Sequence, residues 1–209
     1  MPASRNTIPG TGQASNASRK SGAELTILTA PAENLTDGVV QLRVPSPDAG
    51  DVTTVNGYID NDQLDGGWLP DVPLVPAQQL VADWLDGWAG RQSRNGPAFV
   101  VTVADEPGFV GVIGMTEHDD GAFDIEYGTA PVFRGRGLAS RATRLAAQWM
   151  SRQPSVRTVE VLIGEGQRAC ERVAVKAGFV LDEATNPPDP GSGAAVQLRY
   201  IMQRRAAPE

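Results

Sequence analysis

A strand, a glycine turn and a helix follow one another between residues 121 and 150, and this order constrains the fold more than any other feature. Residues 121–131 carry the aromatic and β-branched residues of a strand. Gly135 and Gly137 then break that pattern. Beyond them apolar residues recur at helical spacing, as in a helix that packs on a sheet: Leu138, Ala142, Leu145 and Trp149. The order is typical of an α/β domain.

The glycine turn predicts an anion site. The first turn of a helix offers unpaired N–H groups and a partial positive charge, and glycines let a phosphate approach the backbone closely. The segment Arg134–Ala139 reads R-x-x-G-x-A, which is neither a P-loop nor a dinucleotide fingerprint. We therefore expect a pyrophosphate cradle of another kind. The alternatives are a nucleic-acid patch and a solvated basic helix face.

Charge is distributed unevenly along the chain. The formal net charge of the 209 residues is -7, yet residues 133–176 hold nine basic and three acidic residues. Residues 44–90 and 105–126 contain no Lys or Arg. Net acidity argues against a general nucleic-acid binder, which needs clustered cations. One cationic and two anionic segments instead indicate an anionic ligand at one place and a cationic one at another.

Composition limits the domain count and the compartment. The single cysteine, Cys170, excludes an internal disulfide framework and suits a reducing compartment. Residues 1–23 are polar and lack aromatic residues, so we expect a disordered tail there, one domain over residues 24–205 and a short tail over 206–209. No apolar run approaches the ~20 residues that span a bilayer, and no secretory signal is recognisable. The expected location is the cytoplasm, without membrane contact.

Periodicity predicts further elements on both sides of the glycine turn. Helices are expected after Ser46 and Pro47, over residues 77–90 and over residues 166–178. The other expected strands cover residues 25–30, 38–44, 97–105, 108–118, 156–164, 179–184 and 194–205. The strands between residues 97 and 131 are joined by short turns, which predicts an antiparallel meander. The result is a single α/β domain with a mixed sheet.

The glycine turn, the strand after it and the segment GQRACERVAVKAGF at residues 166–179 together resemble the core of the GNAT acetyltransferase superfamily. Within it, the sequence is similar to the RimJ/RimL-like branch of ribosomal-protein N-terminal acetyltransferases. The resemblance covers residues 37–204 and is strongest from Asp124 to Phe179. It implies a mixed, mostly antiparallel seven-stranded sheet that is split into a V and flanked by about four helices. Acetyl-CoA would bind in the V, with its pyrophosphate on the glycine turn.

The family motif implies a role for each matching position. Arg141 or Arg144 would reach the 3′-phosphate, and Gln167 stands where the family has an asparagine that contacts the pantetheine. The backbone that would pair with the pantetheine arm belongs to Tyr127, Gly128 and Thr129. The pyrophosphate would meet the glycine turn and its flanking residues: Arg134, Gly135, Arg136, Gly137, Leu138, Ala139 and Ser140.

Four positions bear on catalysis. Ala174 occupies the place where many relatives keep a tyrosine that protonates the leaving thiolate. Cys170, in the place of a serine, is a candidate acid or else a small buried helix residue. Asp124 and Glu126 lie two residues apart on one strand and hence on one face. They are candidates for the base that deprotonates the amine, or else the solvent side of the strand.

The predicted function is acetyl-CoA-dependent acetyl transfer to a primary amine. The acidic segments fall where the resemblance places the acceptor, so we expect a cationic acceptor such as a peptide or protein N-terminus. Two alternatives stay open: a small-molecule amine such as an antibiotic, and a CoA-binding regulatory protein without turnover. No metal is expected, because His118 is the single histidine of the sequence. A homodimer is compatible with this fold.

Overall fold

Three consecutive antiparallel strands form the centre of the sheet: β3 (Ala98–Val103), β4 (Gly111–Glu117) and β5 (Ala122–Thr129). They are the meander expected between residues 97 and 131. The structure, a computed structural model, describes residues 28–61, 63, 68–69, 75–91, 96–118, 121–182 and 197–202. Neighbouring side chains of the meander strands point to opposite faces, so both faces need cover.

Five further strands complete an eight-stranded sheet in the order β1-β2-β3-β4-β5-β6-β8-β7. They are β1 (Leu35–Thr36), β2 (Val40–Arg43), β6 (Thr158–Gly164), β7 (Phe179–Leu181) and β8 (Gln197–Met202). The mostly antiparallel mixed sheet is confirmed, with one strand more than the seven that the resemblance implies. Strand β1 was not expected, because two residues are too few to show a period. Residues 28–30 of the strand expected at 25–30 have no regular structure, and the rest of it lies outside the described residues.

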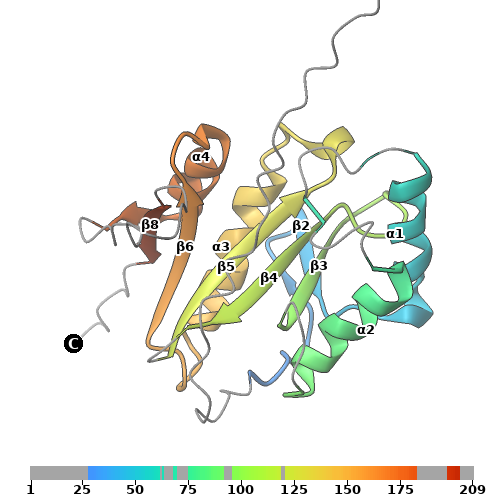
Figure 1. Cartoon of the computed structure of the whole chain (residues 1–209), viewed down its shortest axis with the longest axis horizontal. Helices are drawn as coiled ribbons and strands as arrows, with labels where there is room; N and C mark the ends of the chain where they lie inside the picture. The colour runs from blue at the N-terminus through green and yellow to red at the C-terminus, as the bar shows by residue number, and fades with distance from the viewer. Residues whose placement is uncertain are drawn as a thin grey trace, which may run out of the picture.

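The sheet splits between β5 and β6. These strands run parallel and are joined by three residue pairs, from Ala122–Thr158 to Asp124–Glu160. Beyond Asp124, β5 continues beside β4, whereas β6 continues beside β8. In Figure 1 the two strands meet at one end and diverge toward α4 (Arg168–Ala177) at the other. The expected V is therefore confirmed, and pairing stops at Asp124.

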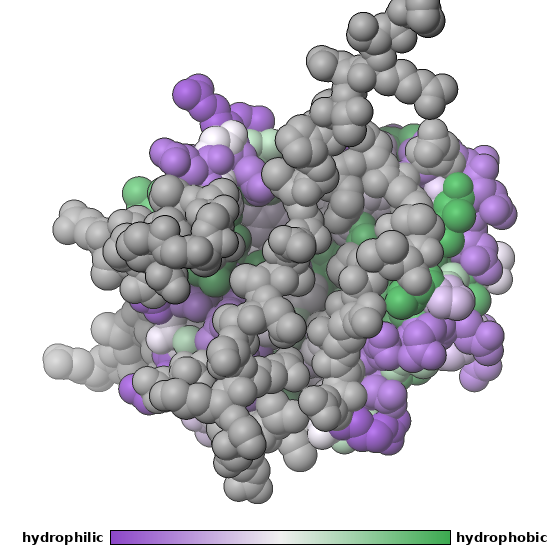
Figure 2. Space-filling model, in the orientation of Figure 1, coloured by the Kyte–Doolittle hydropathy of each residue, from purple (hydrophilic) through white to green (hydrophobic). Residues whose placement is uncertain are grey.

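Helices cover the two faces of the sheet. α3 (Leu138–Met150) and α4 pack with the side chains that lie on one face, Phe99 and Ile113 among them. α1 (Asp51–Asp60) and α2 (Ala77–Trp88) pack with those of the other face, which include Val100 and Val112. Hydrophilic residues gather along the outer sides of α1 and α2 (Figure 2). Within the described residues, no helix has the length and apolar content to cross a membrane.

The start of α1 differs from the expectation. Pro47–Ala49 forms a short 3₁₀ turn, η1, and α1 begins after Gly50. The fully buried Asp51 accepts hydrogen bonds from the Arg43 guanidinium at 2.6 and 2.8 Å and from the Ser46 N–H at 2.7 Å. A carboxylate that accepts three hydrogen bonds holds the groups that donate them firmly in place. Asp51, rather than Ser46, therefore joins the end of β2 to the first helix.

Candidate active site

The chain turns sharply between the end of β5 and the start of α3. A short 3₁₀ turn, η3 (Pro131–Phe133), leads into Gly135 and Gly137, whose φ angles are +78° and +76°. Residues that carry a Cβ rarely adopt this left-handed backbone conformation. No atom lies within 4 Å of a Cβ built on either glycine, so both face open space. Gly137 caps α3 without any side-chain hydrogen bond, and the N–H groups of a first helical turn have no partner within the helix.

That space belongs to the V cavity, a hollow of about 670 Å³ whose lining comes from β3, β4 and β5, the glycine turn and α4. Twelve of the residues that the sequence nominated line it: Glu126, Tyr127, Gly128, Thr129, Arg134, Gly135, Gly137, Leu138, Ala139, Ser140, Gln167 and Cys170. Four nominated residues, Asp124, Arg136, Arg141 and Arg144, are not among its lining. The glycine turn, β5 and α4 thus meet around one volume, as the sequence predicted.

The cations around the cavity are partly different from those expected. Arg134 lines it and donates from Nε to the Thr129 carbonyl at 3.2 Å. Arg172 and Lys176 of α4 also line it, although the sequence analysis missed both. With Ala169 and Val173 they form a stripe at positions i, i+3, i+4 and i+7, and this helical spacing was the signal that would have revealed them.

The other arginines of the glycine turn and α3 have partners elsewhere. Arg136 lies 5.2 Å from the centre of the Phe133 ring and 3.6 Å from Glu106. Arg141 pairs with Asp37 at 2.7 Å, and Arg144 donates to the carbonyl of Lys176. None of the three lines the V cavity. Their placement turns them toward the β3–β4 loop, the β1–β2 turn and the end of α4.

The sequence of residues 40–180 matches the acetyltransferase (GNAT) domain family. The chain belongs to the GNAT acetyltransferase family. This membership confirms the predicted class of enzyme, an N-acetyltransferase. The position of the V and of the glycine turn agrees with the resemblance from which both were expected.

Solved structures share this fold at low sequence identity. A GNAT-family acetyltransferase from Bacillus anthracis has a TM-score of 0.58 at 16% identity, over 81% of this chain and 96% of that one. The ribosomal-protein acetyltransferase RimL in complex with coenzyme A has 0.61 at 14%, over 81% and 96%. The microcin self-immunity acetyltransferase MccE in complex with acetyl-CoA and AMP has 0.56 at 14%, over 80% and 96%. No curated protein matches the sequence. At these identities the likenesses show a shared fold.

The two carboxylates of β5 occupy different environments in this acetyltransferase. Glu126 is exposed and lines the V cavity. Asp124 is buried, and its Oδ1 accepts a hydrogen bond from the Leu162 N–H at 3.0 Å. Burial, and then the nearby charge of Glu126, raises the pKa of Asp124 well above its usual value. The expected shared face is confirmed, but only Glu126 opens onto the cavity.

A hydrogen bond joins Cys170 and Tyr127 in the wall of the V cavity. The Tyr127 hydroxyl donates to the Cys170 carbonyl at 2.7 Å, and both residues line the cavity. Burial raises the pKa of the half-buried Cys170 thiol, while the charge of Arg134 acts in the other direction. The thiol is therefore held in its protonated form at neutral pH.

Aromatic residues close the side of the cavity next to α2. Trp68 and Trp84 line it, and both are nearly fully buried. A Cβ on Gly128 would stand 2.1 Å from the Trp68 carbonyl oxygen, so only glycine fits this position of β5. The tryptophans thus serve as core residues and as cavity wall at once.

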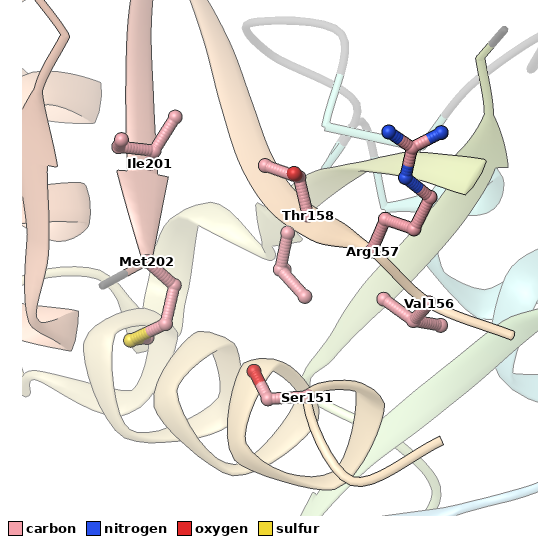
Figure 3. A pocket seen from close by; sticks show the side chains of 7 residues that line it. Ser151, Val156, Arg157, Thr158, Ile201 and Met202 are labelled. Carbon is pink, nitrogen blue, oxygen red and sulfur yellow. The ribbon is translucent and has the colours of Figure 1, made fainter. Parts of the chain in front are cut away.

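Neither a metal centre nor the second cavity competes with this site. The described residues contain no group of three His, Cys, Asp or Glu side chains able to hold a metal. A cavity of about 230 Å³ lies between the end of α3 and strands β6 and β8 (Figure 3). Its lining is mostly apolar, and the Ser151 hydroxyl there already donates to the Ala147 carbonyl at 2.7 Å. Its polar side chains are Ser151, Arg157 and Thr158, and its lining contains no carboxylate, histidine or cysteine.

Proposed function

We propose that the protein transfers the acetyl group of acetyl-CoA to the primary amine of a cationic acceptor, such as a peptide or protein N-terminus. The observation that carries this proposal is the open glycine turn at the start of α3, which faces a cavity in the split of the sheet. Helix N-termini bind phosphate groups, and the family uses an acyl donor with a pyrophosphate. The CoA-bound RimL and MccE folds support the same donor.

The cavity lining supports a placement for each part of the donor. The N–H groups of residues 135–140 would receive the pyrophosphate, and Arg134 would add charge. The backbone of Tyr127, Gly128 and Thr129 would run beside the pantetheine arm, with Gln167 across from it. Arg172 and Lys176 replace Arg141 and Arg144 as the proposed partners of the 3′-phosphate. Arg136 would contribute only its long-range field.

Two side chains of the lining suit the proton transfers. Glu126 would accept a proton from the attacking amine, directly or through a water. The amine attacks the thioester carbon, and a strand N–H stabilises the oxyanion that forms. The carbon–sulfur bond then breaks as the carbonyl is restored. Cys170 would donate its thiol proton to the departing sulfur. Its raised pKa supports this role, because an acid must be protonated when the thiolate leaves.

The charge around the cavity supports a cationic acceptor. Glu126 and the two tryptophans stand on the side of α2, and segments 44–90 and 105–126 contain no Lys or Arg. Carboxylates and aromatic faces attract ammonium groups. The glycine turn and α4 carry the opposite charge, on the donor side. A protein N-terminus, the acceptor that the RimJ/RimL-like resemblance implies, would present its ammonium group to this side.

Mass spectrometry of acetylated products tests the proposal directly. The protein is incubated with acetyl-CoA and three peptides that differ only in basic, neutral or acidic residues after the N-terminus, together with small amines. We expect the basic peptide to be acetylated most rapidly. Preference for a small-molecule amine would move the acceptor to the antibiotic or natural-product class. Tight acetyl-CoA binding without acetylation of any amine would favour a regulatory CoA-binding protein.

A further inference from the structure

Asp124 stands at the fork of the V, where the pairing between β5 and β6 ends. The last residue pair of this parallel ladder is Asp124 with Glu160. In an unbroken register, Glu126 would lie opposite Leu162. The strands diverge before this point, and the Leu162 N–H meets the side chain of Asp124 at 3.0 Å instead of a β5 carbonyl. The Asp124 carboxylate thus accepts the hydrogen bond that a β5 carbonyl would accept if the two strands stayed paired.

The surroundings of Asp124 do not suit a proton acceptor for a substrate. Its side chain is 6% exposed and is absent from the lining of the V cavity. Glu160 lies opposite it on β6 and is neutralised by Arg199, whose Nε approaches Glu160 Oε2 at 2.5 Å. An unpartnered amide at this depth costs more than a hydrogen bond yields. The carboxylate therefore has a structural partner at the fork and is not part of the cavity wall.

We propose that Asp124 is a positioning residue, which holds the Leu162 amide and thereby fixes the point at which β5 leaves β6. This inference rests on the proposed function in one respect: the β5 residues that leave the fork, Glu126 to Thr129, are the ones assigned to acetyl-CoA and to the base. An anchored fork holds them at a set distance from α4. A loosened fork lets this edge of the cavity move, which weakens donor binding.

Amide hydrogen exchange at Leu162 and acetyl-CoA affinity test the inference in three proteins: wild type, Asp124→Ala and Asp124→Asn. The asparagine keeps an oxygen acceptor without the charge, whereas alanine removes the acceptor. We expect Asp124→Ala to exchange the Leu162 amide at least about tenfold faster and to bind acetyl-CoA about tenfold more weakly. Asp124→Asn keeps Leu162 protected and binds acetyl-CoA within about threefold of wild type.

Val159→Ala serves as the matched control for general destabilisation, because Val159 is buried in the same ladder but on the opposite face. It lowers the melting temperature and leaves Leu162 exchange and acetyl-CoA affinity unchanged. Equal protection of Leu162 in Asp124→Ala and wild type would overturn the inference. So would weak binding by Asp124→Asn, which would point to the charge instead. If Asp124→Ala does not fold, fast Leu162 exchange in wild type or in Asp124→Asn overturns it.

The failure of the proposed function would look different. A wild-type protein that binds no acetyl-CoA refutes the donor assignment, yet Leu162 exchange still decides whether Asp124 holds the fork. Conversely, normal acetyl-CoA binding by all variants with unchanged Leu162 exchange would refute the role of Asp124 and leave the donor assignment intact.

Discussion

At the scale of the residue, we expect the proposed donor site to depend most on Gly137. A glutamate there would enter the open space of the V cavity and set a negative charge against the pyrophosphate. We expect Gly137→Glu to weaken acetyl-CoA binding by at least about 100-fold, which corresponds to about 2.7 kcal/mol. Calorimetric titration with acetyl-CoA measures this change.

Gly50 provides the matched control. It caps α1 as Gly137 caps α3, its φ is +79°, and it too has no atom within 4 Å of a built Cβ. Gly50→Glu therefore carries the same backbone strain, about 1–2 kcal/mol, far from the cavity lining. We expect both variants to lose similar stability, while only Gly137→Glu loses affinity. Equal acetyl-CoA affinity in the two variants would refute the cradle.

Cys170 gives a prediction for the chemical step alone. We expect Cys170→Ala to lower kcat at least about 100-fold, the lower end of the range of a general acid, because no thiol proton reaches the leaving sulfur. The affinity for acetyl-CoA should stay within about twofold, because a helix residue of similar size remains. Stopped-flow detection of released CoA measures kcat. Full turnover by Cys170→Ala would leave Cys170 a small packing residue.

At the scale of elements, we expect α4 to contact the 3′-phosphate of acetyl-CoA. Arg172 and Lys176 lie one helical turn apart on the face that lines the V cavity. We expect the double variant Arg172→Ala with Lys176→Ala to bind acetyl-CoA at least about tenfold more weakly, from the loss of charge-assisted hydrogen bonds. Its affinity for the 3′-dephospho form should hardly change. Both affinities come from competition binding.

The control for α4 is the double variant Arg141→Ala with Arg144→Ala. These arginines are bound to Asp37 and to the Lys176 carbonyl, outside the lining. The affinity for acetyl-CoA should therefore stay within about twofold, the scale of an exposed ion pair. A larger loss here than in the α4 variant would return the 3′-phosphate to α3, as the family motif first implied.

The elements also show how far sequence reasoning extends. The stripe from Leu138 to Trp149 and the glycines at 135 and 137 are local signals, so the helix, the turn and the meander were predictable. The insertion of β8 between β6 and β7 was not, because strand order depends on contacts between distant segments. The expected role of the α3 arginines, Arg141 and Arg144, at the 3′-phosphate did not match the cavity lining, for the same reason. Charge in a sequence does not say which carboxylate a side chain meets, and Asp37 lies 104 residues from Arg141.

At the scale of the whole molecule, the acidic and the cationic segments each contribute to the lining of the V cavity. Glu126 comes from an acidic segment, whereas Arg134, Arg172 and Lys176 come from the cationic one. The sequence predicted the separation of charge, and the fold brings these residues together. Asp124 could be placed beside Glu126 from the alternation of a strand. Its burial could not, because that depends on β6, which follows 34 residues later in the chain. The sequence therefore could not distinguish Glu126, the proposed base, from Asp124, the proposed positioning residue.

Asp124 also couples the stability of the whole molecule to pH. Burial, and then the charge of Glu126, raises its pKa above the ordinary value of 3.8 in the folded state. Between 3.8 and that raised pKa the folded protein binds more protons than the unfolded chain, so the Asp124 contribution to stability falls as pH rises. The slope approaches about 1.4 kcal/mol per pH unit within this window. Above the window the penalty is constant.

Asp124→Asn has no such titration, because its amide stays neutral. We compare the melting temperature of Asp124→Asn with that of wild type at each pH. The difference, variant minus wild type, should be smallest below about pH 3.8, where Asp124 is protonated in both the folded and the unfolded protein. The difference should grow in favour of the variant as pH rises. Paired thermal melts from acid to neutral pH measure it, and the other carboxylates cancel in the comparison. A difference that stays constant or shrinks with rising pH would mean that Asp124 is ionised without penalty at the fork, against the burial that defines it.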